Sequence, residues 1–294
     1  MTPTPRNYLE LVVLAAIWGA SFLFMRMGAS DFGPAGLAFL RGAGACALLL
    51  PLLVWRGEWG ALRANWGRIA LVGLTNSALP FMCFAYAALA LNAGLSAVFN
   101  ATTPLWGALI AWFWLRDRLS GSRVLGLALG FAGVAWLAWD QAGIKANTQG
   151  VSPGQAALAC VGATCLYGFS ASFTKRYLAG IPAMALAAGS QLSTAAVLAA
   201  PALLTWPAQS PQAHSWFAAL ALALLCTGIA YVLYFRLLAR LGPAQAMSVT
   251  YLIPMFAMLW GALVLGEALT PVVIGAGGVI LLGTALTTGL IKLR

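Results

Sequence analysis

Residues 102–120 read TTPLWGALIAWFWLRDRLS, and a stretch of the same design, YLIPMFAMLWGALVLGEALT, returns at residues 251–270. Each has a proline near its start. Each ends with an acidic residue, one intervening residue, a leucine and a residue with a hydroxyl side chain. Pro104 thus corresponds to Pro254, and Asp117 corresponds to Glu267, at a spacing of about 150 residues. A recurrence of this length indicates that the chain of 294 residues consists of two related halves.

The composition places the chain in a lipid bilayer. Hydrophobic residues make up 62% of it and charged residues 7%, whereas an ordinary soluble domain carries about 25% charged residues. The lipid bilayer is therefore an expected partner. The five cysteines lie in apolar runs without metal-ligand spacing, so we interpret them as buried thiols and expect neither a metal nor another cofactor.

Apolar runs of roughly 20 residues, the length needed to cross a bilayer, are separated by glycine, proline, asparagine or charge. The ten predicted spans are 8–27, 34–55, 67–90, 94–115, 121–139, 153–174, 182–205, 215–238, 243–265 and 271–291. The polar stretches between them are too short to form a domain. The expected fold class is therefore an all-α integral membrane protein with ten transmembrane helices.

The distribution of Lys and Arg predicts the orientation. With ten spans both termini lie on one side, and if that side is the cytoplasm, only Arg26, Arg41 and Lys145 of the 16 basic residues lie outside. Basic residues concentrate in cytoplasmic loops of membrane proteins. We therefore predict a bacterial-type inner membrane protein with both termini cytoplasmic. The net charge of +10 follows from this topology, and no nucleic-acid partner is expected.

Each half contains five predicted spans, an odd number, so the second half enters the membrane from the opposite face. The predicted organisation is one five-helix repeat over residues 1–139, a connecting loop at 140–152 and a second, inverted repeat over 153–294. Inverted repeats of this kind surround the substrate site of many secondary transporters.

A half built in this way resembles the EamA-type module of the drug/metabolite transporter superfamily. The matching residues are Pro104, Asp117, Leu119, Ser120, Gly126 and Gly133, and then Pro254, Glu267, Leu269, Thr270 and Gly283. Asp117 stands where the family usually has glutamate. The resemblance implies a secondary transporter, most similar to YddG-like exporters of aromatic and other amino acids. Relatives with this module also carry nucleotide sugars, polyamines and cationic drugs, so the substrate stays open.

Residues that are polar or aromatic at equivalent positions of both halves are candidates for substrate contact, because polar groups at membrane depth normally face a cavity or a bundle interior. The pairs are Trp18 with Tyr167, Ser21 with Ser170, Ser77 with Thr227, Phe81 with Tyr231, and Asn100 with Thr250. Aromatic walls with a few hydrogen-bonding groups suit a small amphipathic solute. The alternative is that the hydroxyls bond to their own helices and the rings fill the core.

Two prolines and one arginine have two interpretations each. Pro104 and Pro254 each remove a backbone hydrogen bond inside a span, so they are either hinges or static kinks. Arg41 lies roughly 10 Å into the second span at 1.5 Å per residue. It either attracts a substrate carboxylate or snorkels outward to helix-end carbonyls. The resemblance implies a peripheral second helix, which favours snorkelling.

An enzyme is not expected, because the single histidine, His214, lies in a loop and no metal-binding or paired-carboxylate motif lies at depth. Titratable groups lie at the ends of the spans, with only Glu10 near the hydrocarbon. This favours a facilitator or exchanger over a proton antiporter. The predicted function is export of small metabolites, above all amino acids including aromatic ones, by alternating access of a monomer around a central cavity. The alternatives are an exporter of other amphipathic solutes or cationic drugs, and a channel-like facilitator.

Overall fold

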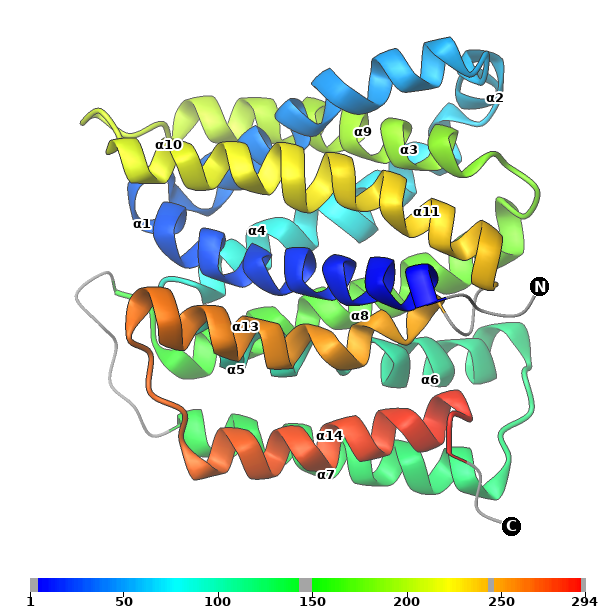
Figure 1. Ribbon diagram of the computed structural model, residues 1–294, viewed down its shortest axis with the longest axis vertical. Helices are drawn as coiled ribbons and strands as arrows, with labels where there is room; N and C mark the ends of the chain where they lie inside the picture. Colours follow the sequence, from blue (N-terminus) through cyan, green and yellow to red (C-terminus); the bar gives the residue numbers. More distant parts are fainter. Residues whose placement is uncertain (1–4, 143–149, 243–245, 292–294) are drawn as a thin grey trace.

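All regular structure in the described part of the chain is helical. The computed structural model describes residues 5–142, 150–242 and 246–291. The helices run along roughly one common direction (Figure 1). Seven helical segments are long and apolar enough to cross a bilayer. Lys145, Lys292, Arg294 and the beginning of the span predicted at 243–265 lie outside the described residues.

Helix α1 (Pro5–Trp55) contains the first two predicted spans. Its two arms meet at Gly33, whose φ of 68° is readily accessible only to glycine. The chain turns back at this point (Figure 1). The first arm is longer than predicted, because the segment expected to be a loop at 28–33 is helical up to the turn.

The rest of the first half follows the predicted spans with one interruption. Its elements are α2 (Trp59–Ala64), α3 (Trp66–Gly73), the π-helix η1 (Leu74–Ala78), α4 (Leu79–Ala87), α5 (Ala93–Asn100), α6 (Thr103–Leu115) and α7 (Gly121–Ala142). The span predicted as continuous over 94–115 is divided between α5 and α6. The division falls just before Pro104, because the proline ring cannot continue the hydrogen-bond ladder of α5.

The second half repeats this order of elements. They are α8 (Pro153–Tyr177), α9 (Ala183–Leu204), α10 (Ala213–Leu220), the π-helix η2 (Ala221–Ile229), α11 (Ala230–Leu241), α13 (Val249–Leu265) and α14 (Pro271–Thr288). The two π-helices occupy equivalent positions of the halves, and such segments are frequent at functional sites. The halves differ at the second proline, since α13 continues through Pro254. With α1 counted as two arms and α5 and α6 counted together, the described residues form about ten helical segments.

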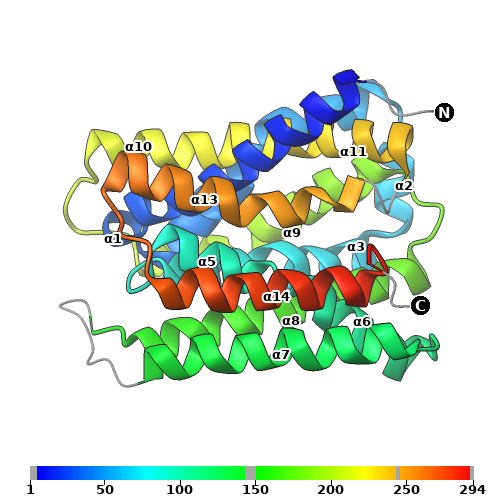
Figure 2. The same cartoon turned by 60° about the horizontal axis from the view of Figure 1, so that its bottom comes forward.

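Helices α7 and α14 pack side by side at one edge of the bundle (Figures 1 and 2). A Cβ atom added to Gly126 would lie 2.6 Å from the carbonyl oxygen of Gly283, and one added to Gly133 would lie 2.8 Å from the Ile280 side chain. Residue numbers therefore rise along α7 as they fall along α14, so the two helices are antiparallel. Glycine permits this close approach of two helices within the chain.

Contacts between the halves occur in equivalent pairs. A Cβ atom on Gly19 of α1 would lie 2.9 Å from the backbone nitrogen of Ala257 in α13. A Cβ atom on Gly168 of α8 would lie 2.7 Å from the backbone nitrogen of Gly107 in α6. Each residue of the first contact has its equivalent in the second contact, about 150 positions away. The halves are thus related in their contacts as well as in their sequence.

Candidate functional site

A central cavity of about 460 Å³ lies among helices of both halves. Its wall includes eight of the ten residues predicted to contact substrate: Trp18, Ser21, Phe81, Asn100, Tyr167, Ser170, Tyr231 and Thr250. Ser77 and Thr227 do not line it. Neither does Pro104 or Pro254, although their neighbours Thr103 and Ile253 do.

Aromatic pairs at equivalent positions face the cavity. The ring centroids of Trp18 and Tyr234 lie 5.3 Å apart, and those of Tyr167 and Phe84 lie 6.2 Å apart in a stacked arrangement. Trp18 is equivalent to Tyr167, and Phe84 is equivalent to Tyr234. Phe84 and Tyr234 are absent from the predicted set, although the same filter for paired aromatic positions selects them. It could not find Asn76, another lining residue, because the equivalent position holds a cysteine.

Ser77 and Thr227 join helices instead of lining the cavity. The Gln191 amide Nε2 donates to Ser77 Oγ over 2.9 Å, and Arg41 Nε donates to Thr227 Oγ1 over 2.8 Å. Arg41 is equivalent to Gln191, so these bonds form another related pair. Each ties a helix of one half to a π-helix of the other.

Arg41 lies in the cavity wall with only 8% of its surface exposed. It makes no hydrogen bond to a helix-end carbonyl in the described part of the chain. The favoured interpretation of a snorkelling arginine on a peripheral helix is therefore wrong. The second arm of α1 packs against the other half closely enough for Arg41 to reach Thr227, and this is a tertiary effect that its own span does not reveal.

We name the end of the bundle where α1 begins and α14 ends the termini end (Figure 1). The residues that line the cavity toward that end include Thr174, Leu186, Phe235, Met247 and Val249. Toward the opposite end, Phe22 and Phe84 meet edge to face with ring centroids 5.6 Å apart. The residue equivalent to Phe22 is Ala171, which is too small to close the termini end in the same way.

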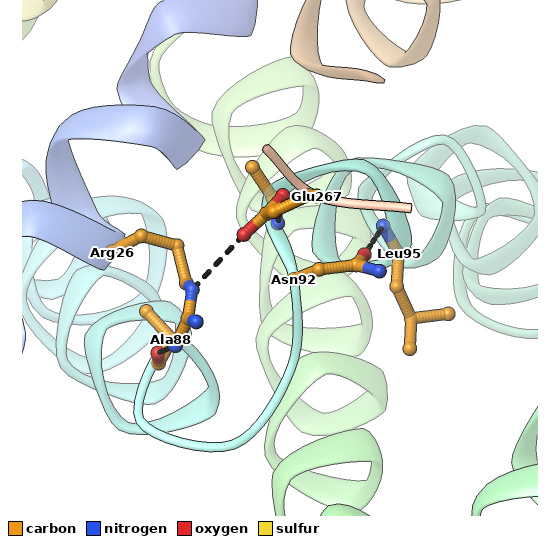
Figure 3. A network of polar contacts seen from close by, with 6 residues as sticks. Arg26, Ala88, Asn92, Leu95 and Glu267 are labelled. Atoms are coloured by element: carbon orange, nitrogen blue, oxygen red, sulfur yellow. Dashed lines mark hydrogen bonds and ion pairs between the residues drawn. The ribbon is translucent and has the colours of Figure 1, made fainter. Parts of the chain in front are cut away.

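A network of polar contacts lies at the opposite end, around Arg26 and Glu267 (Figure 3). Arg26 Nε lies 3.1 Å from Glu267 Oε1, and a terminal nitrogen of Arg26 donates to the Ala88 carbonyl. The backbone N–H of Ala93 donates to Glu267 Oε2 over 2.8 Å. This Glu267 network connects the first arm of α1, the end of α13 and the connection between α4 and α5.

The equivalent ion pair at the termini end is simpler. Lys175 Nζ lies 2.8 Å from Asp117 Oδ2, and the two side chains are 64% and 42% exposed. Each makes no other polar side-chain contact in the described part of the chain. Glu267 is 11% exposed in comparison. The two ends of the molecule therefore carry related ion pairs, of which that at the opposite end is the less exposed and is extended by backbone groups.

Glu10, the carboxylate predicted to lie nearest the hydrocarbon, forms ion pairs with arginines and does not line the cavity. Glu10 Oε1 lies 3.2 Å from Arg6, 3.0 Å from Arg236 and 3.7 Å from Arg240, so it joins α1 to α11 at the termini end. No Asp, Glu or His is among the described residues that line the cavity. Within the described ranges no group of three or more His, Cys, Asp or Glu side chains could hold a metal ion.

Comparisons with known proteins agree with this arrangement. The model of the EamA-like transporter family matches twice, at residues 7–139 and 154–289. The inner membrane transporter YedA of Escherichia coli is 30% identical over 95% of this chain and 89% of its own. A probable terminal-alkyne amino-acid exporter of Streptantibioticus cattleyicolor is 25% identical over 94% of this chain and 91% of its own.

One solved crystal structure has the same fold. It superposes with a TM-score of 0.65 at 21% identity, and the match covers 98% of both chains. The double family match, the relationship to YedA and the helical bundle around a central cavity lead to one conclusion. The chain belongs to the EamA-like transporter family, and it is a multi-pass membrane protein that acts as a secondary transporter and not as an enzyme.

Proposed function

We propose that the protein exports small metabolites, above all amino acids including aromatic ones, across the bacterial inner membrane by alternating access. The observation that carries this proposal is the central cavity with its equivalent aromatic pairs, Trp18–Tyr234 and Tyr167–Phe84. Rings of this kind hold an apolar or aromatic side chain, and the few polar groups between them orient its head group.

The transporter consists of two inverted repeats, residues 1–139 and 153–294, joined by residues 140–152. The antiparallel packing of α7 against its equivalent α14 supports the inversion. The related contacts between the halves support it as well, since such pairs arise when a two-fold axis in the membrane plane relates two copies. The basic residues at the termini end support a cytoplasmic position for that end.

Ser120 and Thr270 provide a direct test of the inversion, because both are exposed and equivalent. In a cysteine-free background, we expect Ser120→Cys to react with a membrane-impermeant maleimide only from the cytoplasmic face and Thr270→Cys only from the periplasmic face. Labelling is measured in intact cells and in inverted vesicles. Reaction of both cysteines from the same face would rule out inverted repeats.

Alternating access in this architecture exchanges the state of the two ends. The cavity reaches toward the termini end while the Glu267 network and the Phe22–Phe84 contact close the opposite end, as expected of an inward-facing state. Pro104 and Pro254 are the proposed hinges, because each lies next to a lining residue, Thr103 or Ile253, and has no backbone N–H to donate. A single chain encloses the cavity, so we propose that the monomer is functional.

The energy source is the substrate gradient or an exchange of substrates. A carboxylate that switches a proton antiporter must face the transport path, and the described lining residues include none. An unrelated possibility, a channel-like facilitator, predicts flux that does not saturate and shows no trans-stimulation. Exporters of other amphipathic solutes or of cationic drugs share the fold, and the substrate panel below separates them from an amino-acid exporter.

Substitution of the cavity rings tests the proposal. We expect Trp18→Ala, Tyr167→Ala and Tyr231→Ala each to lower uptake of radiolabelled L-phenylalanine into proteoliposomes by roughly three- to tenfold, the effect of losing one aromatic contact. Folding, measured as the thermal melting temperature in detergent, should change little, because these rings border an open cavity. L-Leucine, a nucleotide sugar and tetraphenylphosphonium complete the panel. Loss of folding in proportion to transport would assign the rings to the core instead.

A further inference from the structure

Arg41 carries an uncompensated charge at membrane depth. None of the ion pairs among the described residues includes it. Its guanidinium carbon lies 3.8 Å from the centroid of the Phe81 ring, and one terminal nitrogen lies 4.0 Å from the Met25 sulfur, a weak acceptor. A buried charge without a carboxylate partner is costly in a protein and more so in a membrane. Such a charge normally has a function.

The second half shows what the structural role at this position requires. Gln191 is equivalent to Arg41, and its neutral amide makes the same helix-to-helix hydrogen bond, to Ser77 in place of Thr227. A neutral donor is therefore sufficient to join these helices. The charge of Arg41 exceeds that requirement, so the repeat itself separates the structural contribution of this side chain from any other.

The guanidinium also has donors to spare. It contains five N–H groups in a planar fork that matches a carboxylate, and the Thr227 bond uses only the one on Nε. Ser21 also lies in the cavity wall, and its buried hydroxyl makes no hydrogen bond to an oxygen or nitrogen atom of the described residues. The described lining residues contain no acidic side chain that would compete for these donors.

We propose that Arg41 binds the carboxylate of the transported molecule and thereby restricts the substrates to small carboxylate-bearing solutes. This inference rests on the proposed function, since it takes the central cavity as the transport site. The aromatic pairs contact the apolar part of the substrate while the guanidinium neutralises its charge. A cationic solute without a carboxylate is repelled by Arg41, which excludes cationic drugs as principal substrates.

The test uses three probes with the same phenyl group: L-phenylalanine, 3-phenylpropionate and phenethylamine. We expect the purified wild-type protein in proteoliposomes to transport both carboxylates and to discriminate against the amine. Arg41→Gln reproduces the chemistry of the other half and keeps a donor for Thr227. It should lower transport of both carboxylates by roughly tenfold or more, the effect of a lost charged hydrogen bond, and reduce discrimination against phenethylamine. Arg41→Lys should transport the carboxylates at a rate between those of the wild-type protein and Arg41→Gln.

Gln191→Ala is the matched control, because it removes the equivalent helix-to-helix hydrogen bond without changing a charge. We expect it to lower the melting temperature but to leave the preference for carboxylate over amine unchanged. The assignment of Arg41 is wrong if Arg41→Gln retains the wild-type preference for carboxylates. It is also wrong if the wild-type protein transports phenethylamine at the same rate as 3-phenylpropionate. Neither result would contradict the proposed export function.

A binding measurement tests the carboxylate site independently of transport. We expect 3-phenylpropionate to quench the tryptophan fluorescence of the wild-type protein at far lower concentrations than phenethylamine. If no probe is transported yet this difference is observed, the proposed export function fails and the carboxylate site remains. Equal quenching by both probes would overturn the carboxylate site, including in the event that Arg41→Gln cannot be purified in folded form.

Discussion

Glu267→Ala is expected to reduce transport at least tenfold and to open the cavity from the periplasmic side. The substitution leaves the Arg26 guanidinium without its carboxylate and the Ala93 N–H without its acceptor, both at the closed end of the bundle. Removing one partner of a fully buried ion pair costs roughly 3–5 kcal/mol. This pair is partly buried, with Arg26 33% exposed, so a cost of about 1–3 kcal/mol is expected. In the proposed mechanism that free energy is lost from the inward-facing state, in which the network is formed, so we expect the equilibrium to shift toward the state that faces outward.

The measurement is the reactivity of a single cysteine in the cavity wall. Ser21→Cys, buried and close to the closed end, should react slowly with an impermeant reagent added to intact cells and at least tenfold faster when combined with Glu267→Ala. Unchanged reactivity and unchanged transport would show that the Glu267 network does not hold this end closed.

Asp117→Ala is the matched comparison, because Asp117 occupies the equivalent position and pairs with the exposed Lys175. An exposed ion pair contributes about 1 kcal/mol or less, so we expect Asp117→Ala to change the transport rate less than threefold. Exchange of the charges distinguishes the two sites further. Asp117→Lys with Lys175→Asp should restore the pair, whereas exchange at Arg26 and Glu267 places each charge against the wrong backbone group.

Gly168→Leu is expected to abolish the folded transporter. A Cβ atom at this position would lie 2.7 Å from the backbone nitrogen of Gly107 and 2.8 Å from the Cβ of Trp106, so no rotamer change can relieve the clash. Overpacking typically costs 1–3 kcal/mol, and more where backbones must separate. Since 1.4 kcal/mol corresponds to tenfold in an equilibrium constant, the folding equilibrium constant should fall at least tenfold. We expect the monodisperse peak in size-exclusion chromatography to be lost.

Gly162→Leu on the same helix is the control. A Cβ atom added to Gly162 meets no atom within 4 Å, and this residue is exposed. We expect a normal yield and melting temperature, because the added side chain points away from other helices. Equal behaviour of the two variants would mean that α6 and α8 do not approach each other as closely as described. Gly19→Leu should behave like Gly168→Leu, since it meets α13 in the equivalent contact.

The sequence was sufficient to predict the membrane location, the helical spans and eight residues of the cavity wall. These features depend on local chemistry, because a bilayer requires about 20 apolar residues per helix and penalises each polar group at depth. Trp18, Ser21, Asn100 and Tyr167 were recognisable for that reason: each has a polar or aromatic equivalent in the other half. The repeat thus substituted for information that a single span does not contain.

Other features were decided only by the tertiary structure. In a membrane protein, lipid-facing and protein-facing positions are both apolar, so the periodicity of a span does not reveal which face meets the cavity. Arg41 was therefore expected on a peripheral helix, although the second arm of α1 brings it within hydrogen-bond distance of Thr227. For the same reason Ser77 and Thr227 read as wall residues, whereas they accept bonds that tie helices together. The partner of each polar group lies on a distant segment, and only packing of the two halves determines which segment that is.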